Sequence, residues 1–163
     1  MIIIVIGVSG SGKTTIGQLL AKKLNWDFSD ADSFHSKANI EKMSHGIPLT
    51  DADRAPWLQA MQEAIDRWLQ EEKNMVMACS ALKASYRQTL LRDPERMEVV
   101  YLKGSFELFA QRLEKRQHHY MKKNMLQSQF DTLEEPKPEE AIVVDASQTP
   151  KAIVQQVLKS LKI

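Results

Sequence analysis

The sequence predicts an α/β fold with a five-stranded parallel sheet flanked by helices. Short apolar runs without polar alternation indicate strands that are buried on both faces, and segments with helical spacing separate them. The runs cover residues 2–6, 75–79, 99–102 and 142–144, and a weaker one covers 27–29. Strands that alternate with helices in this way favour a parallel sheet joined by right-handed crossovers.

The helices are indicated by apolar spacing and by residues suited to helix starts. Pro56 suits a first helical turn, Ser105 can cap the helix that carries Phe109, and Thr149 with Pro150 can begin the last helix. The spaced sets are Ile16, Leu19, Leu20 and Leu24, and later Trp57, Leu58, Met61, Ile65, Trp68 and Leu69.

Length and composition bound the kind of protein. A chain of 163 residues fits a single domain, expected to span residues 1–163. Lys and Arg total 22 against 21 Asp and Glu, so no overall basic field predicts a nucleic-acid partner. No apolar stretch approaches the roughly 20 residues needed to span a bilayer, so we expect no membrane partner.

The cysteine content and the start of the chain favour a cytoplasmic protein. Cys79 is the single cysteine, so an intrachain disulfide is impossible and a reducing compartment is favoured. Its simplest interpretation is a small buried apolar residue. The apolar residues 2–6 lack a basic leader and a cleavage site, and they run directly into a glycine-rich loop, so they are interpreted as a strand.

That loop carries the strongest signal for function. Residues 7–14 read Gly-Val-Ser-Gly-Ser-Gly-Lys-Thr, which matches the P-loop pattern between a buried strand and a helix. In such a loop, backbone N–H groups and the helix N-terminus hold phosphates, the lysine reaches the terminal phosphates and the threonine binds Mg²⁺. We therefore expect a P-loop NTPase fold that binds a nucleoside triphosphate and Mg²⁺. The expected nucleotide-binding residues are Gly7, Ser9, Gly10, Ser11, Gly12, Lys13, Thr14 and Thr15.

Other classes of P-loop protein fit less well. A GTPase should carry Asn-Lys-x-Asp, and the sequence has no Asn-Lys pair. A large ATPase usually places an aspartate at the end of a buried strand, but the run 75–79 is followed by Ser80. Asp145 does follow such a run, yet it stands beside a helix cap, so a turn or nucleobase-loop role is the better interpretation.

Two carboxylates follow the second predicted strand. Asp30 and Asp32 lie two residues apart, so on an extended segment both can face the loop. One could hold Mg²⁺ through water, and the other could accept the proton of an attacking hydroxyl. A solvated acidic turn is the alternative, but the P-loop favours the functional interpretation.

Several further motifs resemble those of the gluconate kinases over nearly the whole chain. They are residues 30–35 (Asp-Ala-Asp-Ser-Phe-His), 39–43, 46–49, 51–58, 79–83 with Tyr86 and Arg87, 118–121, and 128–130 with Leu133 and Glu134. The resemblance implies a fold similar to shikimate and nucleoside monophosphate kinases, with a substrate-binding helical region at about 35–70 and a mobile lid at about 116–124. It further implies Mg²⁺-dependent transfer of phosphate from ATP to D-gluconate, giving 6-phosphogluconate, and a homodimer.

The resemblance also implies roles for particular residues. Asp32 would orient or deprotonate the attacking hydroxyl, and Asp30 with Thr14 would form the Mg²⁺ side. A gluconate pocket needs fixed cations for the carboxylate, and the substrate-binding residues would be Asp32, His35, Arg54, Lys83 and Arg87. Arg112 would contact the nucleotide, and Arg116 would reach the transferring phosphate from the lid. An ion pair with Asp51 or Asp53 for Arg54, and a solvent-facing helix stripe for Arg112 and Arg116, are the structural alternatives.

Two departures and two alternative functions remain open at this point. The family usually has glycine where this chain has Ala31, and an aromatic residue at the position of His119; neither change removes a charged group. A kinase for shikimate or another small hydroxy acid would share the P-loop and paired aspartates, although residues 80–83 with Tyr86 and Arg87 favour gluconate. A non-catalytic nucleotide-binding regulator has little reason to keep Thr14, Asp32 and Arg116.

Overall fold

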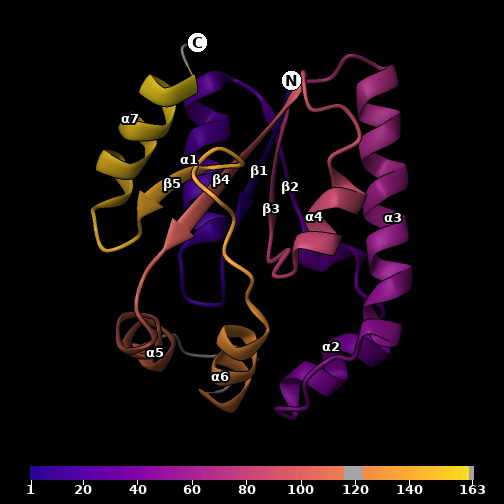
Figure 1. The fold of residues 1–163 in the computed structure, drawn as a ribbon, viewed down its shortest axis with the longest axis vertical. Helices are drawn as coiled ribbons and strands as arrows, with labels where there is room; N and C mark the ends of the chain where they lie inside the picture. Colours follow the sequence, from indigo (N-terminus) through magenta and orange to yellow (C-terminus); the bar gives the residue numbers. More distant parts are fainter. Residues whose placement is uncertain (116–122, 162–163) are drawn as a thin grey trace.

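The computed structural model describes residues 1–115 and 123–161. Helices and strands alternate along the chain (Figure 1). The elements are β1 (Ile2–Ile6), α1 (Lys13–Leu24), β2 (Asp27–Asp30), the short 3-10 helix η1 (Ala31–Phe34), α2 (Lys37–Ser44), α3 (Asp51–Gln70), β3 (Met75–Cys79), α4 (Ala84–Leu90), β4 (Met97–Lys103), α5 (Phe106–Lys115), α6 (Lys123–Thr132), β5 (Ile142–Asp145) and α7 (Pro150–Leu161).

The five strands form one parallel sheet, as the apolar runs predict. Their order is β2-β3-β1-β4-β5, so the first strand lies at the centre. Ile4 pairs with Met77 of β3 on one side and with Val99 of β4 on the other. Because all strands are parallel, their carboxyl ends meet at one edge, where ligands bind in open α/β sheets.

Helices cover both faces of the sheet, which explains the apolar strands. All five residues of β1 are buried, and they alternate between two cores. Ile2, Ile4 and Ile6 pack with α3 and α4 on one face, whereas Ile3 and Val5 pack with α1, α5 and α7 on the other. Figure 1 shows α3 and α4 on one side of the sheet and α1 and α7 on the opposite side.

The sequence located the strands better than the helix boundaries. The weak strand 27–29 is confirmed as β2, but the helix expected to start at Pro56 starts at Asp51. The Thr50 hydroxyl accepts a hydrogen bond from the Asp53 backbone N–H, and the Asp53 carboxylate accepts one from the Thr50 backbone N–H; this capping box fixes the earlier start. Pro56 therefore lies inside the helix.

The other predicted helix starts are confirmed. The Ser105 hydroxyl accepts a hydrogen bond from the Leu108 backbone at 3.2 Å, and the Thr149 hydroxyl accepts one from Ala152 at 3.2 Å. The predicted region 35–70 contains α2 and α3. The predicted lid at 116–124 falls mainly outside the described residues, which resume where α6 begins. Among the described helices, none has both the length and the apolar character that crossing a membrane requires.

Candidate functional site

The loop between β1 and α1 brings backbone N–H groups to the carboxyl edge of the sheet. Gly12 caps α1 with a φ of 95°, and Gly10 has a φ of 83°. A Cβ at Gly10 would lie 2.9 Å from the Phe109 carbonyl oxygen, so the loop packs too closely on α5 for a side chain there. Gly7 lies under the loop against Ser11. The exposed start of α1 favours an anion through its free N–H groups and dipole.

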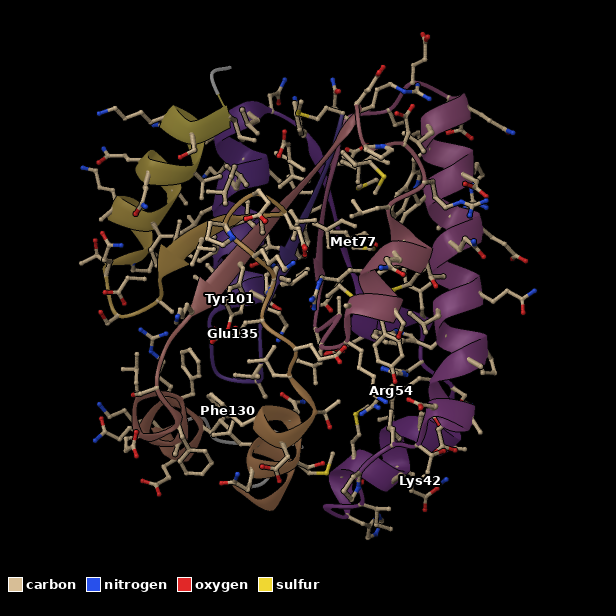
Figure 2. The ribbon with its side chains drawn as sticks, in the orientation of Figure 1. Lys42, Arg54, Met77, Tyr101, Phe130 and Glu135 are labelled. Atoms are coloured by element: carbon tan, nitrogen blue, oxygen red, sulfur yellow. The ribbon has the colours of Figure 1, made fainter. Side chains whose placement is uncertain are left out.

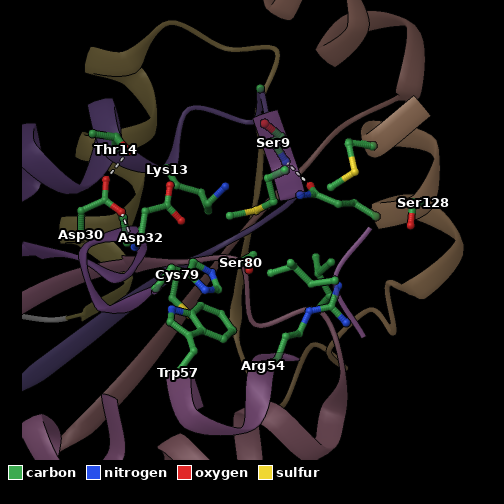
Figure 3. Close-up of a pocket in the computed structure, with 18 of the residues that line it drawn as sticks. Ser9, Lys13, Thr14, Asp30, Asp32, Arg54, Trp57, Cys79, Ser80 and Ser128 are labelled. Atoms are coloured by element: carbon green, nitrogen blue, oxygen red, sulfur yellow. Dashed lines mark hydrogen bonds between the residues drawn. The ribbon is translucent and has the colours of Figure 1, made fainter. Parts of the chain in front are cut away.

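A pocket opens in front of this loop (Figure 3), and we call it the central pocket. It is lined by Ser9, Gly10, Gly12, Lys13, Thr14, Asp30, Asp32, His35, Met43, Pro48, Leu49, Arg54, Trp57, Ala78, Cys79, Ser80, Leu82, Met125, Ser128 and Gln129. The structure thus brings the P-loop, both aspartates, His35 and Arg54 together, as the sequence predicts.

Thr14 and Asp30 form a compact oxygen site on one side of the central pocket. The Thr14 hydroxyl donates to Asp30 Oδ2 at 3.0 Å, and the Asp32 backbone N–H donates to Asp30 Oδ1 at 3.0 Å (Figure 3). The described residues contain no cluster of three or more His, Cys, Asp or Glu side chains able to hold a metal. A hydroxyl and one carboxylate suit Mg²⁺, which keeps several waters and takes further oxygens from phosphates.

His35 is fixed in the pocket wall by two neighbours. Its ring stacks on Trp57 with centroids 4.4 Å apart, and its Nδ1 lies 3.3 Å from the Asn39 amide nitrogen. Since an amide nitrogen can only donate, Nδ1 accepts and the neutral ring carries its proton on Nε2. Burial lowers the pKa of His35; Asp32 acts in the opposite direction and Arg54 in the same one. A neutral imidazole with one N–H to donate therefore faces the pocket.

Arg54 is held by a chain of polar groups behind the pocket. Its Nη1 donates to the Tyr86 hydroxyl at 3.2 Å, and Tyr86 donates to Asp51. Lys83 Nζ donates to both Asp51 oxygens at 2.9 and 3.1 Å. Hydrogen bonds from Tyr86, and then from Lys83, lower the pKa of Asp51. Arg54 therefore presents a fixed cation to the pocket, whereas Lys83 is engaged with Asp51 and does not line it.

The structure does not bring Arg87 to the central pocket, so a substrate role for it stays a prediction. Its side chain is buried, at 6% exposure. Nη1 donates to the carbonyls of Ala81 and Leu82 at 2.9 and 3.2 Å, and Nη2 donates to that of Glu134 at 2.7 Å. Burial lowers the pKa of this arginine, while Glu140 and Glu134 oppose the shift. Arg87 therefore ties two chain segments together.

A second pocket lies on the other side of the P-loop, and we call it the side pocket. It is lined by Gly10, Ser11, Gly12, Thr15, Ile16, Arg112, Ala146, Gln148, Pro150 and Ile153. Arg112 is fixed there because its Nη2 donates to the Ala146 carbonyl at 2.5 Å and its Nη1 lies 3.4 Å from that of Ser11. Ala146, Gln148 and Pro150 of this pocket follow Asp145, for which the sequence suggested a turn or nucleobase-loop role.

Helix α6 supplies residues for which the sequence gave no role. Met125, Ser128 and Gln129 line the central pocket, and Gln129 Oε1 accepts a hydrogen bond of 2.6 Å from the Ser9 backbone (Figure 3). Residues 128–130 were matched to a family motif, but no pattern within one segment could reveal a contact across 120 residues. Arg116 and His119 lie outside the described residues.

Comparisons with known proteins agree with this geometry. The shikimate kinase family model matches residues 9–162. A probable gluconokinase from Xenopus tropicalis is 44% identical, over 96% of this chain and 91% of the relative. The chain also resembles the structure of a gluconokinase from Sinorhizobium meliloti 1021, with 42% identity, a TM-score of 0.87 and coverage of 98% of this chain and 90% of the other.

A sugar kinase from Janibacter sp. HTCC2649, in its unliganded structure, is also 42% identical, with a TM-score of 0.92 over 99% of this chain and 94% of that one. Both kinds of comparison extend over nearly the whole chain. The chain belongs to the gluconokinase family, within the shikimate kinase group of P-loop kinases.

Proposed function

We propose that the protein transfers the terminal phosphate of ATP directly to D-gluconate, forming 6-phospho-D-gluconate. The observation that carries this proposal is the central pocket, where the P-loop, the pair Asp30 and Asp32, and the cation Arg54 line one space. Gluconokinase relatives at 40–44% identity support the substrate.

On the nucleotide side, the chain supplies positioning and charge. The N–H groups of the loop and of the start of α1 hold phosphate oxygens, and Lys13, whose Nζ now donates to the Val8 carbonyl at 3.2 Å, can turn toward them. Thr14 and Asp30 would hold Mg²⁺, which when bound neutralises charge on the phosphates. The side pocket, with Arg112 fixed at its wall, is the place for the nucleobase.

On the acceptor side, three side chains divide the work. Asp32 orients the attacking hydroxyl and takes its proton. Arg54 pairs with the substrate carboxylate, and the Nε2–H of His35 donates to a hydroxyl of the sugar acid. No covalent enzyme intermediate is required, because transfer is in line from nucleotide to hydroxyl. For Lys83, direct contact with substrate stays a prediction that needs its bonds to Asp51 to break.

The experiment that tests this function measures ADP release with ATP and Mg²⁺ in the presence of gluconate, shikimate, glycerate or AMP. Gluconate is expected to give turnover far above the others, and Asp32→Asn should lower it at least about 100-fold, in the range of losing a general base. If shikimate or glycerate were preferred, the substrate would be that hydroxy acid and not gluconate. Nucleotide binding without turnover on any acceptor would favour the regulator.

A second test concerns the charge of Lys13. Lys13→Ala should lower kcat by about two to three orders of magnitude, because a preorganised charge at the transferring phosphate is lost. Lys23, an exposed lysine in the last turn of the same helix, provides the matched control Lys23→Ala. Near wild-type turnover in Lys13→Ala would refute the assigned role.

The homodimer and the cytoplasmic location remain predictions, and so does the role of Arg116. Sedimentation at micromolar protein concentration measures the oligomeric state directly.

The metal requirement is tested by omitting Mg²⁺ from the ADP-release assay. Activity should be lost and then restored when Mg²⁺ is added back.

A further inference from the structure

We propose that Gln129 is a positioning residue that couples occupancy of the P-loop to the placement of α6 over the acceptor. Its carboxamide oxygen holds the Ser9 N–H while no terminal phosphate is bound, and it yields that N–H to the phosphate when ATP enters. This inference rests on the proposed function, because it assumes a triphosphate on the loop and an acceptor in the central pocket.

The contact itself is short and sheltered. Gln129 Oε1 accepts from Ser9 N at 2.6 Å, and Ser9 is only 7% exposed. Ser9 belongs to the loop whose inward-facing N–H groups bind phosphate oxygens in P-loop proteins. A side chain from a distant helix therefore occupies a donor that the nucleotide needs.

The position of Ser9 shows which phosphate is concerned. The central and side pockets share Gly10 and Gly12, but Ser9 lines only the central pocket and Ser11 only the side pocket. With the base in the side pocket, the phosphate chain runs along the loop toward the central pocket. Its last phosphate reaches the Ser9 end, so Gln129 competes with the terminal phosphate rather than with the first two.

Helix α6 is anchored so that Gln129 is presented to the loop. Leu126 is fully buried in the core, and Phe130 packs against Phe106 and Phe109 of α5 with ring centroids 5.8 and 6.1 Å apart. After the helix, the Glu134 N–H donates to the Leu82 carbonyl at 2.8 Å. The contact with Ser9 thus depends on a packed helix and not on a loose loop.

The exchange favours the phosphate. A hydrogen bond to a charged phosphate oxygen is roughly twice as strong as one to a neutral amide oxygen. Gln129 and Ser128 both line the central pocket, so a carboxamide released from Ser9 stays within the space that the acceptor would occupy. Because coupling is reciprocal, a terminal phosphate that displaces Gln129 changes acceptor affinity, and the acceptor changes triphosphate affinity by the same factor.

The test is calorimetric titration of ADP and of a non-hydrolysable ATP analogue, with Mg²⁺ and without acceptor. Gln129→Ala removes the internal competitor, so the analogue should bind about three- to tenfold more tightly, the range of one net hydrogen bond, while ADP affinity stays unchanged. Gln129→Glu should act in the opposite direction, because its carboxylate holds Ser9 N–H and repels the terminal phosphate. Gln127→Ala is the control, since Gln127 is exposed on the same helix and bonded to Asp131.

A second titration measures the coupling. In wild-type protein, gluconate affinity should differ between the nucleotide-free and the analogue-bound states. In Gln129→Ala that difference should be smaller. Equal effects on ADP and the analogue, or no effect of either Gln129 variant, overturn the proposal. Normal nucleotide selectivity with no turnover of gluconate would instead defeat the proposed function, so the two failures are distinguishable.

Discussion

The imidazole of His35 is held between the Trp57 ring and the Asn39 amide, and burial lowers its pKa from the usual value near 6.5. Protonation would place a proton on Nδ1, where the Asn39 amide already donates. The same contacts that make the ring a good neutral donor in the pocket therefore make its charged form unfavourable. The contacts of His35 with Trp57 and Asn39 therefore determine both its hydrogen bonding in the pocket and its response to pH.

This geometry predicts a pH dependence of stability. The unfolded chain binds a proton at His35 as pH falls through about 6.5, before the folded protein does, so the free energy of unfolding should fall between pH 7.5 and 5.5. His35→Gln should flatten this fall, whereas wild type and variant should behave alike above pH 7.5. Urea unfolding across that range measures the difference. An identical slope in both proteins would show that His35 titrates freely.

Below that window, other groups dominate. Hydrogen bonds from the Thr50 backbone and Lys42 lower the pKa of Asp53 to about 2. The folded pKa is depressed, so this contribution is present above the ordinary carboxyl range and is lost as pH falls toward 2. The histidine effect is therefore separated from acid unfolding by more than one pH unit.

At the scale of the element, α4 matters because its buried Arg87 joins the loop after β3 to the segment after α6. That segment is also bonded through Glu134 Oε1, which accepts from the Ala84 N–H at 2.8 Å, and through Glu135 Oε1, which accepts from Tyr101 at 3.1 Å (Figure 2). Leu82 lines the central pocket. The guanidinium thus supports the pocket wall from behind.

A substitution distinguishes this support from substrate binding. Arg87→Met should lower the free energy of unfolding by about 1–3 kcal/mol, because buried carbonyls lose their donor, with less than about a threefold change in the KM for gluconate. The control is Arg92→Met, whose ion pair with Asp66 is about 40% exposed on each side and should cost less than about 1 kcal/mol. If Arg87→Met left urea stability unchanged and raised the KM for gluconate tenfold or more, Arg87 would instead be a substrate-binding residue.

The sequence could predict the strands, the P-loop and the paired aspartates, because each depends on residues that are close in the chain. Family motifs pointed to Arg54 and His35, and both side chains line the central pocket. They also pointed to Arg87, which lies away from that pocket because its donors bind backbone carbonyls, and no residue pattern displays those. Gln129 was missed for a related reason: its partner is a backbone N–H in a loop that lies 120 residues away in the sequence.

For the whole molecule, the strand order decides where chemistry can occur. With β1 central, its loop has one pocket on each side, and the two share only Gly10 and Gly12. In the proposed function, nucleotide and acceptor would approach one loop from opposite directions, which suits in-line transfer. Asp30, Asp32 and Arg54 line the central pocket, on the side of β2 and α3, and Arg112 lines the side pocket, on the side of α7. Figure 1 shows α3 and α7 on opposite sides of the sheet.

Three hydrogen bonds at Glu134 fix the segment that follows α6. The helix is about 15 Å long, and its first turn is fixed as well, because Leu126 is fully buried and Met125 packs with Met43 and Leu49. Because both ends are held, Met125, Ser128 and Gln129 form a rigid wall of the central pocket.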